Sequence, residues 1–333
     1  MNERAAISNL LSQAPQTPMP DWAEPMLAVL TDQRFSDSDW IFERKLDGER
    51  LLVFRTGAHT RLMTRNGQDV TDTYPELAEA VAAQPGSDFI ADGEAVAFNG
   101  QLTSFSRLQG RMQIKDAARA LERAKAIPVY LYLFDLLHFD GHDLTGQPLR
   151  QRKAALYRCL RFDDPLRYTP HRNEEGEASY REACEKGWEG VIAKDATARY
   201  MHGRSRKWLK FKCGHGQEFV ICGFTEPSGE RDGFGALLLG YFENGALRYA
   251  GKVGTGFDDE FLNSFRETLE ARRRDTSPFD DAVEEEAHFV RPEIVAEIGF
   301  TEWTDDHRLR HPRFLGLRRD KAASEVVREE PAS

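Results

Sequence analysis

The run from Val129 to Phe139 is the feature that most constrains the fold. Its residues, VYLYLFDLLHF, are apolar with few interruptions. Such a run is typical of a strand that is buried on both faces, because each face then carries apolar side chains. We therefore predict a buried strand here, inside a domain large enough to cover it.

Shorter strand and helix patterns lie on both sides of this run. Trp40–Lys45 and Arg50–Phe54 flank the turn Asp47-Gly48 and form a hairpin pattern. Further strands are expected at Arg61–Thr64, Asp88–Phe98, Glu189–Lys194 and Lys207–Lys212. Helices are expected at Pro75–Ala83, Phe105–Leu121, Leu149–Leu160 and Ser179–Lys186. This mixture predicts an α+β domain with antiparallel sheets.

The pattern changes after Lys212. From Gln217 onward, short strand patterns with glycine turns dominate, and one helical segment, Glu260–Arg273, interrupts them. Short strands at such spacing predict a small β-barrel, and Cys213–Gly216 is then a hinge. The expected organisation is a mobile leader (1–20), an α+β domain (21–213), a β-barrel domain (217–322) and a flexible tail (323–333).

Charge is distributed unevenly along the chain. The net charge is −10, which by itself disfavours binding to phosphates. Two segments, Arg199–Lys212 and Arg308–Arg319, nevertheless contain many basic residues and no acid. An acidic protein can bind polyanions through such local stripes.

The cysteines and the apolar runs indicate the cellular compartment. Cys159, Cys184, Cys213 and Cys222 are far apart and include no CxxC pair, so we expect reduced structural thiols and neither a zinc site nor a disulfide framework. No run is long and apolar enough for a membrane helix, and the first residues do not resemble a secretory signal. We expect a cytoplasmic protein with no membrane association.

Lys45 is the first candidate for chemistry, in the stretch FERKLDGER. The ordinary pKa of lysine is ~10.4, so it becomes a nucleophile only where burial or nearby positive charge lowers that pKa. By itself, a lysine in a short motif is more often an exposed strand residue. Other residues must support the catalytic interpretation.

Those other residues favour phosphoryl or nucleotidyl transfer. This chemistry needs carboxylates for a divalent metal, cations for phosphate charge and an apolar slot for the base. Asp92-Gly-Glu94 and Glu189-Gly190 supply carboxylates beside glycines, and Lys194, Lys210 and Lys212 supply cations. Lys210 and Lys212 point the same way on a strand, so an anion is expected between them.

These motifs, in this order, resemble those of the ATP-dependent DNA ligases in the covalent nucleotidyltransferase superfamily. The similarity is greatest to the ligase module of bacterial end-joining and repair ligases. It runs from Pro25-Met-Leu-Ala28 to Arg318-Arg-Asp-Lys321, and Lys45-Leu-Asp-Gly-Glu-Arg50 matches the nucleophile motif KxDGxR. The resemblance implies a nucleotidyltransferase (adenylation) domain followed by an OB-fold barrel.

The resemblance also implies roles for individual residues. Lys45 would attack the α-phosphate of ATP and become lysyl-AMP, while Asp47 and Arg50 orient it. The other implied positions are Glu43 at the adenine amino group, Arg65 on phosphate, Glu94 near the ribose and metal, Phe134 stacked on adenine, Glu189 on metal, Lys194, Lys210 and Lys212 on phosphate, and Arg318, Asp320 and Lys321 over the pyrophosphate.

By the same resemblance, Mg²⁺ or Mn²⁺ would be the metal, and the substrate would be duplex DNA with a nick or ends. The chain would act as a monomer, with a Ku-type end-binding protein as a further partner. Few residues precede Lys45, so we expect no helical DNA-binding domain before it and no fused polymerase or nuclease module. Two alternatives stay open: an RNA ligase or another polynucleotide nucleotidyltransferase, such as a GTP-using capping enzyme, and a non-catalytic DNA-binding clamp.

Overall fold

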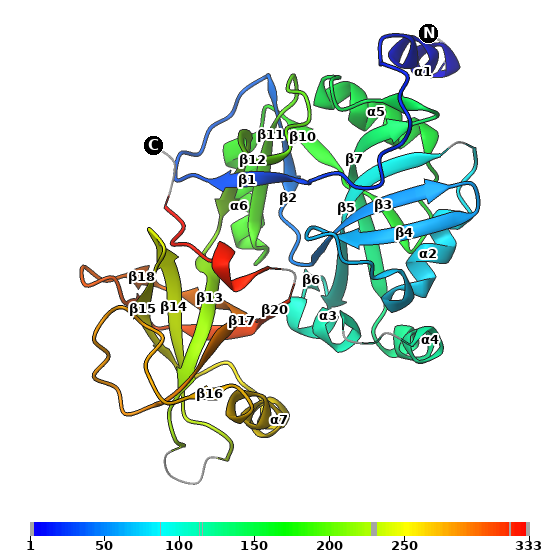
Figure 1. Ribbon diagram of the computed structural model, residues 1–333. Coiled ribbons are helices and arrows are strands. Elements are labelled where there is room, and N and C mark those ends of the chain that lie inside the picture. Colours follow the sequence, from blue (N-terminus) through cyan, green and yellow to red (C-terminus); the bar gives the residue numbers. More distant parts are fainter. Residues whose placement is uncertain are drawn as a thin grey trace. The chain divides into compact units, whose positions relative to one another are not determined.

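The computed structural model describes residues 3–86, 88–112, 114, 116–227, 232–319 and 321–330. The chain divides into two compact units (Figure 1). The first unit ends at Cys213 and the second runs from Gly214 to Glu330. Within the predicted hinge, only Cys213 and Gly214 separate the last strand of the first unit from the first strand of the second.

The predicted buried strand is strand β7 (Val129–Phe139). It pairs antiparallel with β5 (Phe89–Asn99), which pairs antiparallel with β3 (Glu49–Thr56). We call this the β3–β5–β7 sheet. Its other strands are β4 (His59–Thr64) beside β3, β6 (Leu102–Thr103) beside β5, and β8 (His142–Asp143) and β9 (Leu166–Tyr168) beside β7.

Helices bury one face of this sheet (Figure 1). Leu77 and Val81 of α2 (Pro75–Ala82), Phe105 and Leu108 of α3 (Phe105–Met112) and Leu156 of α5 (Leu149–Cys159) share one core cluster with the sheet. A 3₁₀ turn, η1 (Thr71–Thr73), precedes α2. Eight of the eleven residues of β7 are buried, as the sequence predicts.

The single helix expected at Phe105–Leu121 is instead two helices. Helix α3 ends at Met112, and α4 (Ala117–Ala126) begins after Asp116. The Asp116 side chain accepts a hydrogen bond from the backbone N–H of Arg119 at 2.8 Å. Such an N-cap stabilises the start of a new helix, which explains the break.

A second sheet completes the first unit. Its strand order is β1 (Met26–Leu30), β12 (Gly203–Lys212), β11 (Gly190–Asp195), β2 (Trp40–Arg44) and β10 (His171–Asn173). We call it the β2–β11–β12 sheet. Phe42, Val191 and Phe211 pack against α6 (Gly176–Glu185) on one face, so polar side chains are left to the opposite face.

Apolar residues from both sheets meet in one buried cluster. Leu52, Ile90 and Phe134 come from the β3–β5–β7 sheet, and Met26 and Trp208 come from the β2–β11–β12 sheet. Burial of such side chains is the main favourable term that holds two layers together. Arg50 and Lys194, two of the residues that were singled out for chemistry, lie against Phe134 and Trp208 of this cluster.

The described parts of the leader and the tail contain packed residues, and the mobility of these segments stays a prediction. In the leader, Glu3–Ser12 form helix α1, and Leu10 is buried in the core of the first unit. In the tail, Ala323–Glu325 form a 3₁₀ turn (η2), and Val326 is fully buried in the core of the second unit. One of these contacts joins positions that are far apart in sequence, since the Phe242 backbone N–H donates to the Val326 carbonyl at 2.7 Å.

A disulfide joins Cys184, near the end of α6, to Cys213, just after β12. The expectation of reduced thiols was therefore wrong for this pair, whereas Cys159 and Cys222 are free. The two bonded residues are 29 positions apart in sequence, but α6 packs on the sheet that contains β12, which brings their Cα atoms to 5.2 Å. Sequence spacing alone does not show such a contact.

Reduction of this disulfide is expected to lower the free energy of unfolding of the first unit by about 2–4 kcal/mol, because an open loop raises the entropy of the unfolded chain. Urea unfolding with and without reductant measures the difference. Cys184→Ser, which has no bond to lose, should show no effect of reductant. Identical midpoints for the wild type in both conditions would contradict the prediction.

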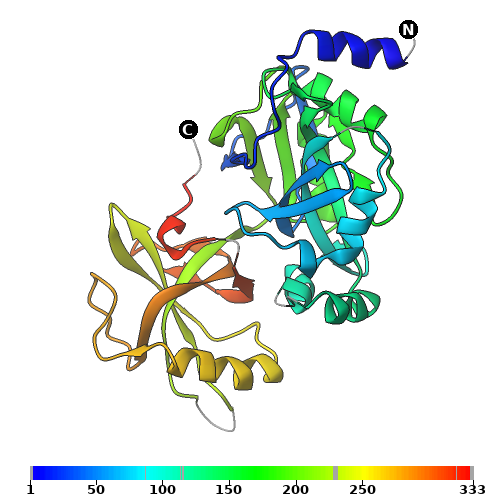
Figure 2. The ribbon, with the colours of Figure 1, turned by 45° about the vertical axis from the view of Figure 1, so that its right-hand side comes forward.

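The second unit is a curled antiparallel sheet around one apolar core (Figure 2). Its strands are β15 (Ala246–Val253), β14 (Leu237–Glu243), β13 (His215–Phe224), β17 (His288–Phe300) and β16 (Arg273–Arg274), with β20 (Arg313–Arg318) also beside β17 and a small hairpin of β18 (Glu302–Trp303) and β19 (Leu309–Arg310). Among the described residues no strand pairing closes the circle, so the predicted barrel is a half-barrel.

One helix covers this core. Helix α7 (Asp259–Glu270) packs Leu262, Phe265 and Leu269 onto the strands, and the Asp258 side chain caps its first turn. The α+β fold followed by a small β domain is thus as predicted. No helix in the described part of the chain is long and apolar enough to cross a membrane.

Candidate active site

Lys45 lies directly after β2, at the edge of the polar face of the β2–β11–β12 sheet. Its backbone N–H continues the strand pairing by donating to the carbonyl of Gly190 at 2.9 Å. Its Nζ lies 2.5 Å from Oε1 of Glu189. A Cβ at Gly48 would be 2.2 Å from the Ala95 carbonyl oxygen, so the turn after Lys45 requires glycine.

The environment of Lys45 sets its protonation. Burial lowers the pKa of Lys45, but the Glu189 carboxylate, with a smaller contribution from Asp47, raises the pKa overall above its ordinary value, against the opposing charge of Lys212. We expected clustered cations and metal to lower this pKa. The ion pair with Glu189 dominates here, so Lys45 is held as an ammonium ion that cannot attack phosphorus.

Glu189→Gln is expected to lower the pKa of Lys45, because the amide carries no negative charge, whereas Lys45 stays buried and burial lowers its pKa. The neutral fraction of Lys45 rises about tenfold for each pKa unit. Labelling with an amine-selective reagent at pH 8–9, read by mass spectrometry, should therefore be faster at Lys45 in the variant. The half-exposed Lys252 is the internal reference. Labelling of Lys45 that is equally fast or slower in the variant would contradict the conclusion that Glu189 raises the pKa of Lys45.

Strand register gathers the other predicted cations on the face of Lys45. Ile192 of β11 pairs with both Glu43 and Lys210, and Gly190 pairs with Lys212. Because side chains alternate along a strand, Glu43, Lys194, Lys210 and Lys212 point away from α6 together. The sheet therefore presents a row of amines and carboxylates beside Lys45.

Glu43 and Lys194 are paired with one another at the buried end of this face. The Glu43 carboxylate is 3% exposed and lies 2.6 Å from Nζ of Lys194 and 2.5 Å from Nζ of Lys153. Burial raises the pKa of Glu43, but the two ammonium groups lower it overall. Burial lowers the pKa of Lys194 to about 8.

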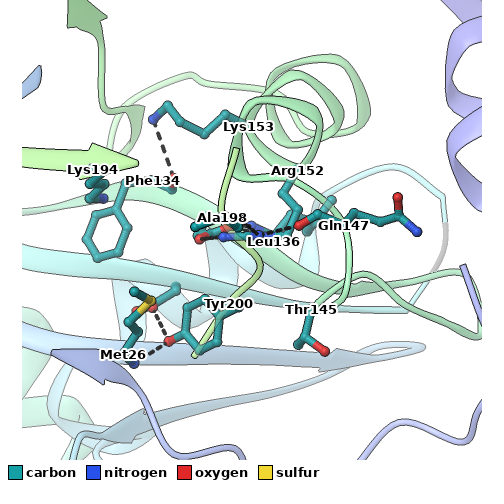
Figure 3. Close-up of polar contacts among 12 residues, drawn as sticks. Met26, Phe134, Leu136, Thr145, Gln147, Arg152, Lys153, Lys194, Ala198 and Tyr200 are labelled. Carbon is teal, nitrogen blue, oxygen red and sulfur yellow. Dashed lines mark hydrogen bonds and ion pairs between the residues drawn. The ribbon is translucent and has the colours of Figure 1, made fainter. Parts of the chain in front are cut away.

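Phe134 lies against this network (Figure 3). Its ring centroid is 4.0 Å from Nζ of Lys194 and 4.7 Å from Cζ of Arg50. Trp208 packs edge-on at 5.9 Å. Phe134 is 7% exposed in this arrangement, so the stacking on adenine that the resemblance implies stays a prediction.

Helix α5 contributes two buried cations that the sequence did not single out. Nζ of Lys153 donates to the carbonyl of Phe134 (Figure 3). It also donates to the carbonyl of Thr169 and to the Glu43 carboxylate. Arg152 donates twice to the Asp135 carboxylate, at 2.8 Å each, and both side chains are fully buried. Only their unusual place on the buried side of α5 could have marked them.

Arg50 is fixed on the opposing sheet by Asp92. The guanidinium donates twice to the Asp92 carboxylate and once to the Met26 carbonyl. Asp92 is fully buried and also accepts from the hydroxyl of Tyr200 at 2.6 Å. This network raises the pKa of Arg50 despite burial. Asp92 of the DGE motif thus positions an arginine, a role that sequence reasoning did not assign.

The remaining predicted residues of the first unit lie on the β3–β5–β7 sheet and its turns. Glu94 stands opposite Arg50 and Tyr132 in register. Asp47 lies in the turn that follows Lys45, and its carboxylate accepts a hydrogen bond from the backbone N–H of Phe105 at 3.2 Å. Arg65 opens the turn after β4.

The three predicted residues of the second unit are only partly described. Arg318 lies 3.9 Å from the Glu297 carboxylate, and Lys321 lies 3.0 Å from that of Glu218. Asp320 lies outside the described residues. Each described cation thus pairs with an acid of its own unit.

Two carboxylates fit the predicted metal. No group of three or more His, Cys, Asp or Glu side chains with metal-binding geometry occurs among the residues that the structure describes. Mg²⁺ is usually held through one or two carboxylates together with substrate phosphates. Glu94 and Glu189 provide such oxygen ligands and no soft ligand, so the donor chemistry suits Mg²⁺ or Mn²⁺ bound with a nucleotide.

Comparison with known proteins identifies relatives for both units. The family model "ATP dependent DNA ligase domain" matches residues 25–212, and "ATP dependent DNA ligase C terminal region" matches residues 230–321. The chain is 38% identical over 326 residues to "Multifunctional non-homologous end joining protein LigD" of Pseudomonas aeruginosa, covering 95% of this chain and 38% of that protein.

Two further matches agree. The chain is 35% identical over 303 residues to "Probable DNA ligase" of Streptomyces griseus, covering 85% of this chain and 57% of that protein. A solved structure, "mycobacterial DNA ligase D complexed with ATP and MES", superposes with a TM-score of 0.66 at 35% identity, covering 92% of this chain and 98% of that one. The chain spans 38–40% of the length of the LigD relatives.

Proposed function

Because this chain belongs to the ATP-dependent DNA ligase family, we propose that it seals breaks between a 5′-phosphate and a 3′-hydroxyl in duplex DNA. One observation carries the proposal. Lys45 stands in the KxDGxR turn, 2.5 Å from Glu189, on the same sheet face as Lys194, Lys210 and Lys212. A nucleophilic amine beside several cations suits attack on a phosphate.

The proposed reaction has three steps. Nζ of Lys45, once deprotonated, attacks the α-phosphorus of ATP, and the bond to the β-phosphate oxygen breaks, releasing pyrophosphate. The 5′-phosphate of DNA then attacks the phosphorus of lysyl-AMP, and Lys45 leaves as an amine. The 3′-hydroxyl attacks the 5′-phosphorus, loses its proton and displaces AMP. Lys210 and Lys212 stabilise charge on the α-phosphate throughout.

Residues of both sheets would position the nucleotide. Phe134 would stack on adenine, Glu43 would accept from its amino group, and Arg50, held by Asp92, would orient the nucleotide near Lys45. Glu94 and Glu189 would hold a divalent cation, which neutralises phosphate charge. If Glu189 bound the cation and no longer paired with Lys45, the negative charge that raises the pKa of Lys45 would be lost.

The partners follow from the family and the charge. The basic stripes Arg199–Lys212 and Arg308–Arg319 would grip phosphates of duplex DNA, largely without reading sequence. Arg65 would contact phosphate, and Arg318, Asp320 and Lys321 of the second unit would act on the pyrophosphate. We propose a monomer that works in the cytoplasm in end-joining repair, with a Ku-type protein as an end-binding partner.

Purified protein with Mg²⁺ is expected to seal a nicked DNA duplex with ATP, at least about 10²-fold faster than with GTP, because Glu43 accepts from an amino group that guanine lacks at that position. An RNA nick should be sealed more slowly than a DNA nick. Denaturing gels of labelled nicked strands measure the rates. Preference for GTP or for RNA would favour the capping-enzyme or RNA-ligase alternative, and DNA binding without sealing would favour the clamp.

A further inference from the structure

The first unit contains a cavity that the proposed reaction does not use. Its volume is ≈ 620 Å³. The lining includes three cations and four aromatic residues: Arg44, Arg167, Lys186, Phe98, Tyr130, Tyr132 and Trp188. We call it the Arg44 pocket. Pockets of this volume accept ligands of nucleotide size.

The Arg44 pocket has an excess of positive charge. No acidic residue lines it within the described part of the chain. Arg167 pairs with Asp164 at 2.6 Å and Lys186 pairs with Glu182 at 2.5 Å, outside the lining.

Arg44 is the cation of this pocket whose charge no carboxylate neutralises among the described residues. Among the described residues, none of the ion pairs involves Arg44, whose guanidinium donates to the Gln101 carbonyl at 3.3 Å. Its Nε is buried and has no hydrogen-bond partner within the described ranges. A partly buried guanidinium without a carboxylate is unfavourable, and its exposed end can still bind a ligand, so an anionic ligand is the natural complement.

Aromatic rings lie next to these cations. Cζ of Arg44 is 4.3 Å and Nζ of Lys186 is 5.0 Å from the centroid of Trp188. Cζ of Arg167 is 3.8 Å from the centroid of Tyr130. Cations that track phosphates, beside rings on which bases stack, are the two components of single-strand nucleic-acid sites.

The pocket is separate from the position of the reacting phosphate. Arg44 and Lys45 are successive residues of one extended segment, so their side chains point to opposite faces of the sheet. Arg44 packs with Trp188, whereas Lys45 contacts Glu189. A phosphate bound to Arg44 is therefore not the phosphate that Lys45 attacks, although Arg44 and Lys45 are neighbours in sequence.

We propose that the Arg44 pocket binds one nucleotide of the DNA strand beside the break, with its phosphate on Arg44, Arg167 and Lys186 and its base against Trp188 or Tyr130. This inference rests on the proposed function, since it assigns a strand contact to the same enzyme. The β- and γ-phosphates of ATP are the other source of such a group. The opposite orientations of Arg44 and Lys45 favour the DNA strand.

Three variants test the proposal: Arg44→Gln, Arg167→Gln and Lys186→Gln. Lys252→Gln is the matched control for Lys186, because both lysines are about half exposed and each pairs with one glutamate. Equilibrium binding of a fluorescent nicked duplex, with and without a short unpaired extension, is measured over a range of salt. The KM for ATP is measured in parallel by transfer of α-labelled AMP to the protein, and thermal unfolding checks that each variant folds.

Each pocket variant is expected to weaken DNA binding about tenfold, as for loss of a charged hydrogen bond, and to reduce the salt slope by about 1. The control should keep both values, and the KM for ATP of Lys186→Gln should stay within about twofold of wild type. A raised KM for ATP with unchanged DNA binding would assign the pocket to the triphosphate and overturn the proposal. Folded variants with unchanged DNA binding and KM would also overturn it. If wild type takes no label, the proposed function fails, whereas the DNA-binding result still judges the pocket.

Discussion

Asp135→Ala is expected to lower the free energy of unfolding of the first unit by about 3–5 kcal/mol, because it leaves a buried charge without its partner. Both Asp135 and Arg152 are fully buried, and two hydrogen bonds of 2.8 Å join them. Without the carboxylate, the partners of Arg152 within the described residues are the carbonyls of Gln147 and Ala198 (Figure 3) and the Tyr200 ring, whose centroid lies 5.6 Å from Cζ. Carbonyl dipoles do not replace a full negative charge.

Urea unfolding of wild type and variant measures this loss. Glu182→Ala is the control, because Glu182 pairs with the exposed Lys186 and Arg172 on the surface, and such pairs contribute only about 0–1 kcal/mol. Asp135→Leu combined with Arg152→Met should recover part of the loss, since it removes both charges together. A change below about 1 kcal/mol for Asp135→Ala would contradict the structure of this buried pair.

Lys45→Ala is expected to reduce sealing of a nicked duplex with ATP by about 10³-fold or more, as for removal of a covalent nucleophile. The same variant should still seal a nick whose 5′-phosphate already carries AMP, because that final step needs no amine at position 45. Lys210 and Lys212 lie on β12, on the same sheet face as Lys45 but on a different strand. This arrangement supports a role for them that is separate from that of Lys45. The two substrates therefore separate the nucleophile from the phosphate-binding residues.

Parallel rate measurements on both nicks provide the check. Lys210→Ala is the comparison, because a residue that stabilises phosphate charge should slow sealing of both substrates. Equal losses on both nicks for Lys45→Ala, in a protein that unfolds like wild type, would show that Lys45 acts in positioning and not as the nucleophile.

Local patterns in the sequence predicted the local structure around some of the candidate site residues. The spacing of Lys210 and Lys212 predicted a shared strand face, and register with β11 shows that face. Gly48 marked a turn, and the Ala95 carbonyl explains why no larger residue fits there. Such features depend on neighbours in the chain, so their physical cause is visible in the sequence.

Contacts across the fold could not be predicted in this way. Lys153 reaches Glu43 across 110 positions of sequence, and Asp92 binds Tyr200 across 108. The raised pKa of Lys45 depends on Glu189, which only strand pairing brings close. Electrostatics depends on distance in space, and periodicity within one segment contains no information on it.

The most direct test of the account is transfer of label from α-labelled ATP, with Mg²⁺, to the protein, followed by a denaturing gel and peptide mapping. Bound AMP is first removed with pyrophosphate. The account predicts one acid-labile AMP on the peptide that contains Lys45, and none in Lys45→Ala. Absence of label in folded wild type, or label on a different residue, would contradict covalent nucleotidyl transfer through Lys45.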